Sequence, residues 1–338
     1  MAIADTSYGT DHNGLICGFL LQPNSPAREI SSEEATHWLA ANSHSPGEDF
    51  LWLHFNLGHT ASEKWLLANA NLAEEFFDAL HEDSHSTRID MVESSLLAVV
   101  NDMHYDFSFE TAEISTLWLS VARRAVISAR LRPLRSIDAL RESVKRGDII
   151  RSPLALLIHL LHEQEDVLVS IIRRVSTRID AAEDKLLAGR PGVTRAELGS
   201  LRRLLVRLQR LLAPEPASLF RLLQAPPPWT DAIDSMELRQ STEEFSVVLR
   251  DMSSLQERIK LLQEEIAAHV NEQNNKSLFI LTIVTVLALP INLSASLLGM
   301  NVGGIPLAQD DNGFWSVVML IISFTGTISW WTFKKWRA

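Results

Sequence analysis

A row of polar side chains lies on one face of an otherwise apolar stretch near the end of the 338-residue chain. Steps of three and four residues, which follow one face of a helix, join Asn275, Leu278, Thr282, Thr285, Leu289, Asn292 and Ser296. We call this set the polar stripe. Away from it, only Ser294 is polar between positions 278 and 298. Polar groups that meet lipid without a partner cost several kcal/mol, so the stripe must face water or another helix.

Two interpretations of the polar stripe are open from the pattern alone. Ser, Thr and Asn side chains commonly hydrogen-bond between membrane helices, which requires only a neighbouring helix. The alternative is that the stripe faces water and a permeating ion. Because one helical hairpin cannot enclose a pore, this alternative requires an oligomer in which the striped helix is innermost.

Two histidine pairs have spacings that suit a metal ion. His81 and His85 are four residues apart with carboxylates between them, and His159 and His162 are three apart with Glu163 beside them. A helix brings residues three or four apart onto one face, and zinc prefers imidazole and carboxylate ligands. The competing interpretation of both pairs is an ordinary surface or interface role.

Motifs and charge argue against an enzyme and against a nucleic-acid-binding protein. The sequence has no P-loop, nucleophile elbow, Cys/His zinc cluster or glycine-rich dinucleotide turn. The formal net charge of −11 disfavours nucleic acid as a partner. We therefore expect neither catalysis nor a resident cofactor.

Two apolar stretches without charged residues are long enough to cross a membrane, and the first of them contains the polar stripe. Since about 20 apolar residues span a hydrocarbon core, we predict membrane helices at about 277–300 and 314–333, joined by a loop over 301–313. A buried core helix is the competing interpretation for each stretch. Their tandem arrangement and the tryptophans near their ends favour a membrane protein. These tryptophans are Trp315, Trp330, Trp331 and Trp336.

The basic residues around these helices predict their orientation. The connecting loop has no Lys or Arg and contains Asp310 and Asp311, whereas basic residues flank the two helices on their other sides. Basic residues stay on the cytoplasmic side, so we expect both termini in the cytoplasm and the loop outside. The polar start of the chain does not resemble a signal peptide, and the single cysteine, Cys17, fits a reducing compartment. The flanking basic residues are Lys276, Lys334, Lys335 and Arg337.

The remainder of the chain predicts an α+β fold with a helical stalk. Residues 1–150 read as a cytoplasmic α/β domain, because short apolar stretches rich in β-branched and aromatic residues alternate with helical patterns. Ser31, with Glu34 three positions later, is typical of a helix N-cap. The expected strands are 15–21, 50–57, 95–101 and two within 116–128, and the expected helices are 32–41 and 61–80.

Residues 151–275 read as a cytoplasmic stalk of long helices, expected over 154–187, 194–223 and 230–300. The last pattern contains no Pro or Gly before Pro290, so a single helix is expected to continue from the stalk into the membrane. We expect the arginines of the second helix to pack against the acidic residues of the third. The third helix also carries a coiled-coil-like seam, formed by Phe245, Val248, Met252, Leu255, Ile259, Leu262 and Ile266.

The motif Gly299-Met300-Asn301 directly follows the polar stripe. Together with the long helix, the short acidic loop, the second membrane helix and the basic C-terminus, it resembles the CorA family of divalent-cation transporters. The continuation over 302–306, Val-Gly-Gly-Ile-Pro, is similar to the ZntB branch of that family, which is associated with zinc. The magnesium branch usually has an aromatic residue before the glycine and Met-Pro-Glu-Leu in the loop.

This resemblance implies a homopentameric, CorA-like funnel in the bacterial inner membrane, with the first membrane helix lining the pore. Asn301 would form a ring of amides at the outer mouth, beside Met300, and Gly299 would permit tight packing or a helix end. Leu278 and Leu289 would be apolar constrictions, and Asp310 and Asp311 would attract cations. The polar positions along the pore would be Asn275, Thr282, Thr285 and Asn292.

Zinc is the ion that the resemblance favours, although the stripe offers amides, hydroxyls and leucines rather than the Cys, His and carboxylate ligands of zinc. One alternative is a magnesium, cobalt or nickel channel of the same family. An alternative of another class is a membrane-anchored coiled-coil scaffold, in which the stripe only joins helices.

Overall fold

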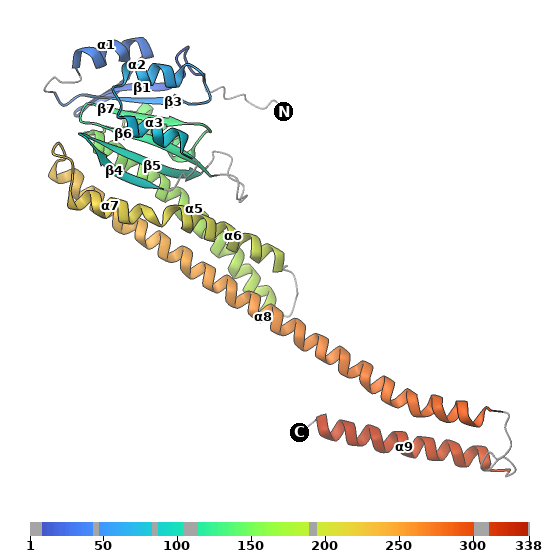
Figure 1. The fold of residues 1–338 in the computed structure, drawn as a ribbon. Coiled ribbons are helices and arrows are strands. Elements are labelled where there is room, and N and C mark those ends of the chain that lie inside the picture. The colour runs from blue at the N-terminus through green and yellow to red at the C-terminus, as the bar shows by residue number, and fades with distance from the viewer. Residues whose placement is uncertain are drawn as a thin grey trace. The chain divides into compact units, whose positions relative to one another are not determined.

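The computed structural model describes residues 9–42, 47–82, 87–103, 114–188, 195–300 and 311–336. Within these ranges, the side chains of residues 298, 329 and 331–336 are not described. Contacts divide the chain into two compact units, Met1–Leu262 and Gln263–Ala338. Figure 1 labels the elements of both units.

The first unit is built on a seven-stranded mixed sheet with the strand order β2-β1-β3-β7-β6-β5-β4. Only the β3–β7 pair is parallel, and the other neighbours are antiparallel. The strands are β1 Leu15–Gln22, β2 Ser25–Glu29, β3 Phe50–Asn56, β4 Arg88–Val92, β5 Ser95–Met103, β6 Ile114–Val121 and β7 Ala125–Arg130.

Helices cover both faces of this sheet (Figure 1). Successive strand residues point to opposite faces, and in β6 both sets are apolar: Leu117 and Leu119 belong to one core, Trp118 to the other. The central strands are therefore buried on two sides. Helices α1 Ser32–Asn42, α2 Ser62–Asn69 and α3 Glu74–His81 supply the Trp118 core, and α4 Arg135–Arg146, α5 Pro153–Leu187 and α7 Pro214–Gln224 supply the other.

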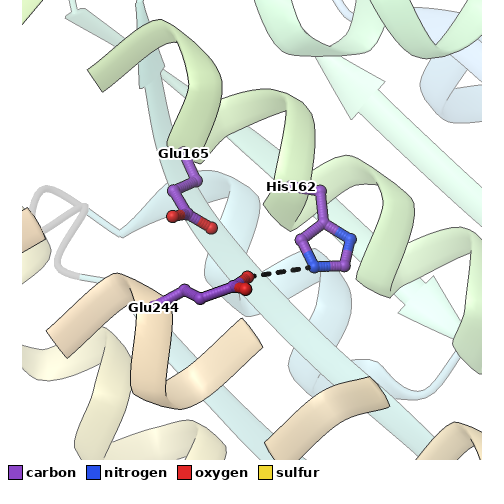
Figure 2. Close-up of side chains that lie close together, drawn as sticks. All are labelled: His162, Glu165 and Glu244. Carbon is purple, nitrogen blue, oxygen red and sulfur yellow. Dashed lines mark ion pairs between the residues drawn. The ribbon is translucent and has the colours of Figure 1, made fainter. Parts of the chain in front are cut away.

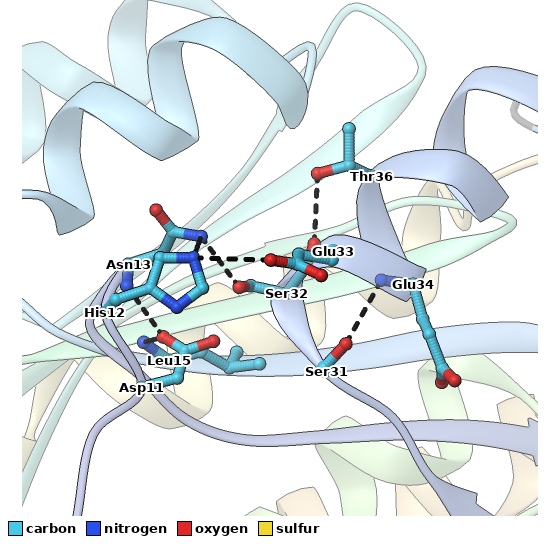
Figure 3. A network of polar contacts seen from close by, with 9 residues as sticks. All are labelled: Asp11, His12, Asn13, Leu15, Ser31, Ser32, Glu33, Glu34 and Thr36. Atoms are coloured by element: carbon cyan, nitrogen blue, oxygen red, sulfur yellow. Dashed lines mark hydrogen bonds and ion pairs between the residues drawn. The ribbon is translucent and has the colours of Figure 1, made fainter.

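Polar contacts fix the start of α1 as predicted (Figure 3). The Ser31 hydroxyl accepts a hydrogen bond from the backbone N–H of Glu34 at 3.2 Å, which is the N-cap interaction. Nearby, the Asn13 amide donates to the Ser32 hydroxyl at 2.8 Å. The Asp11 carboxylate accepts from the backbone N–H groups of Asn13 and Leu15. These contacts hold the chain before β1 against α1.

Two predicted helices are each broken into two. The pattern over 61–80 forms α2 and α3, and between them Asn71 has a φ of 45°, a left-handed conformation that ends a helix. The pattern over 194–223 forms α6 Arg195–Leu212 and α7, because Pro214 lacks the N–H needed to continue α6 and instead begins α7. Strands β2 and β4 and helix α4 were not predicted.

Helix α8, Ala232–Leu298, is one continuous helix, as the absence of breakers before Pro290 predicts. Its seam is buried from Phe245 to Leu262 within the first unit, whereas Ile266 is only half-buried. Gln256 of α8 donates to Gln209 of α6 at 2.8 Å. The seam thus packs largely against helices of the same chain.

The prediction that the arginines of α6 pair with acidic residues of α8 is wrong. Arg258 of α8 donates to Asp180 and Glu183 of α5, both at 2.8 Å. Among the described residues, the arginines of α6 form no ion pair with α8. Their side chains lie beside an apolar contact in which Leu201, Leu204 and Leu208 are buried, so hydrophobic burial rather than charge joins these helices.

The second unit contains the end of α8 and helix α9, Gly313–Trp336. α8 is long and apolar enough to cross a membrane, and its most apolar part is not buried inside the chain. Within α9, Gly313–Ile328 is a shorter apolar helix.

Candidate functional site: an exposed polar stripe and a histidine–glutamate cluster

Every member of the polar stripe is exposed in the single chain. The exposed fractions of Leu278 and Leu289 are 59% and 60%. α8 is helical throughout this stretch, with Pro290 inside it, so the spacing of three and four residues places the seven side chains along one side of the helix.

A different face of α8 is partly covered. Along α8 the half-buried residues include Phe279, Ile283, Leu287, Pro290 and Ser294. Along α9 they include Val317, Ile321, Thr325 and Ile328. The second unit has no other described element, and we infer that each helix partly covers this face of the other. Among the residues that the structure describes, the polar stripe therefore stays exposed.

The two threonine hydroxyls of the stripe are hydrogen-bonded to their own helix. Thr282 donates to the carbonyl of Leu278 at 2.8 Å, and Thr285 donates to the carbonyl of Leu281 at 2.9 Å. A hydroxyl that donates in this way keeps oxygen lone pairs that can accept a hydrogen bond. Each threonine thus presents an acceptor on the open face of α8.

The motif after the stripe lies at the end of the helix. The N–H of Gly299 donates to the carbonyl of Ala295 at 2.9 Å. A Cβ at this position would lie 3.0 Å from the same carbonyl oxygen, so glycine suits this close approach. Met300 is 50% exposed, and Asp311 is exposed. Asn301 and Asp310, which the sequence places at the outer mouth and in the outer loop, lie outside the described residues.

The first histidine pair is only half described. The Nδ1 atom of His81 lies 2.8 Å from the carbonyl oxygen of Phe77, and its Nε2 atom lies 3.4 Å from the Glu63 carboxylate. Both nitrogens therefore have neighbours within the fold, as in an ordinary surface role. His85 lies outside the described residues.

The second pair contributes one residue to a cluster that the sequence did not predict (Figure 2). His162 and Glu165 lie on α5, and Glu244 lies on α8. The Nε2 atom of His162 is 3.5 Å from a Glu244 carboxylate oxygen, and one ligand atom from each residue lies within 4.8 Å of the other two. We call these three residues the His–Glu cluster.

Burial shifts the pKa of one cluster residue and of one neighbour. Burial raises the pKa of Glu165 to about 7, and the neighbouring carboxylate of Glu244 adds to this shift. Burial lowers the pKa of His159, with a further contribution from His162. The predicted partners His159 and Glu163 are not part of the cluster. The spacing His162-x-x-Glu165 was readable in the sequence, but Glu244 is brought close only by the packing of α8 on α5.

Comparisons with known proteins agree with this architecture. Residues 47–335 match the family model described as "CorA-like Mg2+ transporter protein". The divalent cation transporter CmaX of Pseudomonas aeruginosa is 30% identical over 329 residues, covering 97% of each chain. The zinc transport protein ZntB of Pectobacterium carotovorum is 22% identical, covering 96% of this chain and 97% of that protein.

Solved structures give the same fold. The full-length CmaX protein superimposes with a TM-score of 0.81 at 28% identity, over 98% of this chain and 100% of that chain. The CorA magnesium transporter of Methanocaldococcus jannaschii superimposes with a TM-score of 0.74 at 18% identity, over 93% and 96% of the two chains. A match over most of the sequence, with the fold of a soluble α+β unit and two apolar helices, confirms the family predicted from the Gly-Met-Asn motif. The chain belongs to the CorA-like family of membrane metal-ion transporters, which are not enzymes.

Proposed function

We propose that this chain forms a homopentamer that conducts divalent cations, zinc above all, through a pore lined by the polar stripe of α8. The observation that carries the proposal is the exposure of the whole stripe in a hairpin that shields another face of the same helix. A polar face cannot meet lipid, and helices of further copies are the remaining neighbours. Five copies with α8 innermost place the stripes around a common axis.

The residues of this face suit a hydrated ion. Amide and hydroxyl oxygens accept hydrogen bonds from the water shell of a divalent cation, so they can select by size and charge without removing tightly held water. We assign Asn301 to a ring of amides at the outer mouth and Asn292, Thr285, Thr282 and Asn275 to successive positions below it. Leu278 and Leu289 are the apolar constrictions at which dewetting can close the pore.

Charge around the membrane supports an orientation with both termini in the cytoplasm. Asp310 and Asp311 in the outer loop raise the local cation concentration, while Lys334, Lys335 and Arg337 keep the C-terminus inside. We place the first unit in the cytoplasm of a bacterial cell on the same ground.

The assignment of zinc as the transported ion rests on two similarities. Residues 299–306 resemble the ZntB branch, and nearly the whole chain is similar to ZntB. A specific observation favours magnesium as the second candidate. The ligand atoms that the stripe can offer a metal ion are amide and hydroxyl oxygens, and oxygen is the ligand type that magnesium prefers. The description of the matching family model also names magnesium.

The test is ion uptake into liposomes that contain the purified full-length protein. With a zinc-sensitive dye inside, wild type should admit zinc and the Asn301→Ala variant should not, because the ring of amides at the outer mouth is lost. Repeating the assay with a magnesium-sensitive dye decides between the two ions. Absence of flux of any divalent cation through oriented oligomers would overturn the transporter and leave a membrane-anchored scaffold.

A further inference from the structure

The His–Glu cluster joins two helices that other contacts already hold in register. Toward one end of the pair, Arg151 lies 3.3 Å from Glu237 of α8. Toward the other end, Arg258 of α8 binds Asp180 of α5 at 2.8 Å. His162 and Glu244 lie between these two contacts, so the spacing of the helices at the cluster is set by the fold.

The three side chains combine one ion pair, between His162 and Glu244, with a second carboxylate from Glu165. Among the described residues, neither Glu165 nor Glu244 forms an ion pair with a Lys or Arg; their carboxyl groups face each other and hydrogen-bond, with one imidazole for the two acids. The side chain of Gln240 donates to Glu244 at 2.9 Å and orients that carboxylate. Two carboxylates that share a site repel one another, and a divalent cation between them would cancel their charge.

The distances fit a zinc-sized coordination sphere. Zinc binds His nitrogen and carboxylate oxygen at about 2.0–2.2 Å, which places neighbouring tetrahedral ligand atoms roughly 3.4 Å apart. The separation of 3.5 Å between His162 Nε2 and the Glu244 oxygen already matches this value. Only Glu165 has to approach, since its ligand atom lies within 4.8 Å of the others. A flexible glutamate can cover a gap of about 1 Å by rotating its side chain.

We propose that His162, Glu165 and Glu244 bind a divalent transition-metal ion of the zinc class and that this ion fastens α5 to α8. Imidazole selects zinc, cobalt or nickel over magnesium, which prefers an all-oxygen site. The side chains of His162 and Glu244 are each 40% exposed, which gives the ion a path from solvent and leaves the fourth position to water. The site lies wholly within the first unit and does not depend on the pore.

Zinc binding to the metal-free, full-length protein in detergent tests this site. Equilibrium dialysis against buffered zinc, with millimolar magnesium present, should give one tight site per chain in wild type. Glu165→Gln, Glu244→Gln and His162→Gln should each weaken it tenfold or more. The matched controls Glu163→Gln and Glu243→Gln remove neighbouring carboxylates from the same two helices and should bind as wild type does.

A second measurement separates loss of binding from loss of folding. Without metal, Glu165→Gln should unfold at the same temperature as wild type or higher, because it removes one of two facing carboxylates. Zinc should raise the unfolding temperature of wild type and of Glu243→Gln but not that of Glu165→Gln. The Asn301→Ala variant should bind zinc at the His–Glu cluster as tightly as wild type does, which would show that the site is independent of the pore. Wild-type zinc affinity in all three ligand variants would overturn the proposal.

Discussion

Thr285 and Thr325 make the same local interaction on the two membrane helices but have different surroundings. Each hydroxyl donates to a carbonyl four residues earlier, at 2.9 Å in α8 and 2.6 Å in α9. Thr285 is exposed on the polar stripe, and Thr325 is half-buried on the covered face of α9. The pair therefore offers a matched test of whether the stripe acts on ions.

Thr285→Val should lower zinc flux in liposomes, because valine keeps the shape of the side chain but cannot accept a hydrogen bond from the ion's water shell. One lost hydrogen bond, about 0.5–1.5 kcal/mol, corresponds to roughly a 2- to 12-fold change, and an oligomer loses several. Thr325→Val should leave the flux near that of wild type. Equal effects of the two substitutions would contradict a pore-lining role for Thr285.

Glu215 is a buried acid that makes stability depend on pH. It is fully buried on α7, its closest partner is the Gln164 amide at 3.5 Å, and one of its oxygens has no partner among the described residues. Burial raises its pKa from 4.5 to about 8; the Gln164 hydrogen bond opposes the shift and Asp102 adds to it. The folded protein thus favours the neutral carboxyl. Its contribution to stability is full below about pH 4.5 and is lost as the pH rises through about 8.

Glu215→Gln should therefore flatten the decline in unfolding temperature between about pH 4.5 and 8, and above pH 8 the variant should unfold at a higher temperature than wild type. Tryptophan fluorescence of the full-length protein in detergent measures this directly, since the chain has nine tryptophans. The exposed Glu243→Gln variant is the control and should follow wild type. Parallel pH profiles for Glu215→Gln and wild type would rule out this assignment.

At the scale of elements, apolar burial outweighs charge in holding α8 against α5 and α6. Met252 is fully buried in the seam, whereas the Arg258 side chain is 35% exposed and its ion pairs are partly screened by solvent. Truncating a buried methionine costs about 2–5 kcal/mol, and a solvent-exposed ion pair contributes about 0.2–1 kcal/mol.

Met252→Ala should consequently destabilise the protein more than Arg258→Gln does, as measured by chemical denaturation of both variants. Added salt should reduce the effect of Arg258→Gln on stability. Salt screens the Arg258 ion pairs in wild type, so the substitution then removes a weaker interaction. Salt should not reduce the effect of Met252→Ala. A larger loss from Arg258→Gln would mean that charge sets the contact.

The long elements were predictable from the sequence because their signals are repetitive. α5, α8 and five of the seven strands follow from apolar periodicity and from the absence of breakers. The break at Asn71 was not predictable, since asparagine is common in helices and only the tertiary fold demands its positive φ. The break at Pro214 was readable, because proline excludes a continuous helix. Short edge strands such as β4 have too few residues for a clear pattern.

The two candidate sites also differ in how far the sequence predicts them. The polar stripe is a pattern within one helix, so its face followed directly from the spacing. The His–Glu cluster needs Glu244 from a helix about 80 positions later in the chain than His162, and no local pattern reveals which acidic residue of α8 meets α5.

At the scale of the whole molecule, the surface of the second unit fits a bundle in lipid. The outward residues of α9 include Phe314, Met319 and Leu320, with exposed fractions of 72%, 66% and 69%. Such apolar faces are stable against hydrocarbon, whereas the exposed stripe of α8 is not. Assembly around the stripe removes the polar face of α8 from lipid and leaves the apolar residues of α9 facing hydrocarbon. This arrangement is the central claim of the proposed pore.

Reaction of single cysteines with a charged, membrane-impermeant thiol reagent tests this claim most directly. The chain suits the method because its one cysteine, Cys17, is buried and burial raises its thiol pKa to about 12, so it gives little background. With the protein in liposomes, cysteines at Thr282, Thr285 and Asn292 should react and block zinc flux. Cysteines at Ile283, Leu287 and Ser294 should not react. Reaction without this periodicity, or protection of all six positions, would contradict a water-filled pore along the polar stripe.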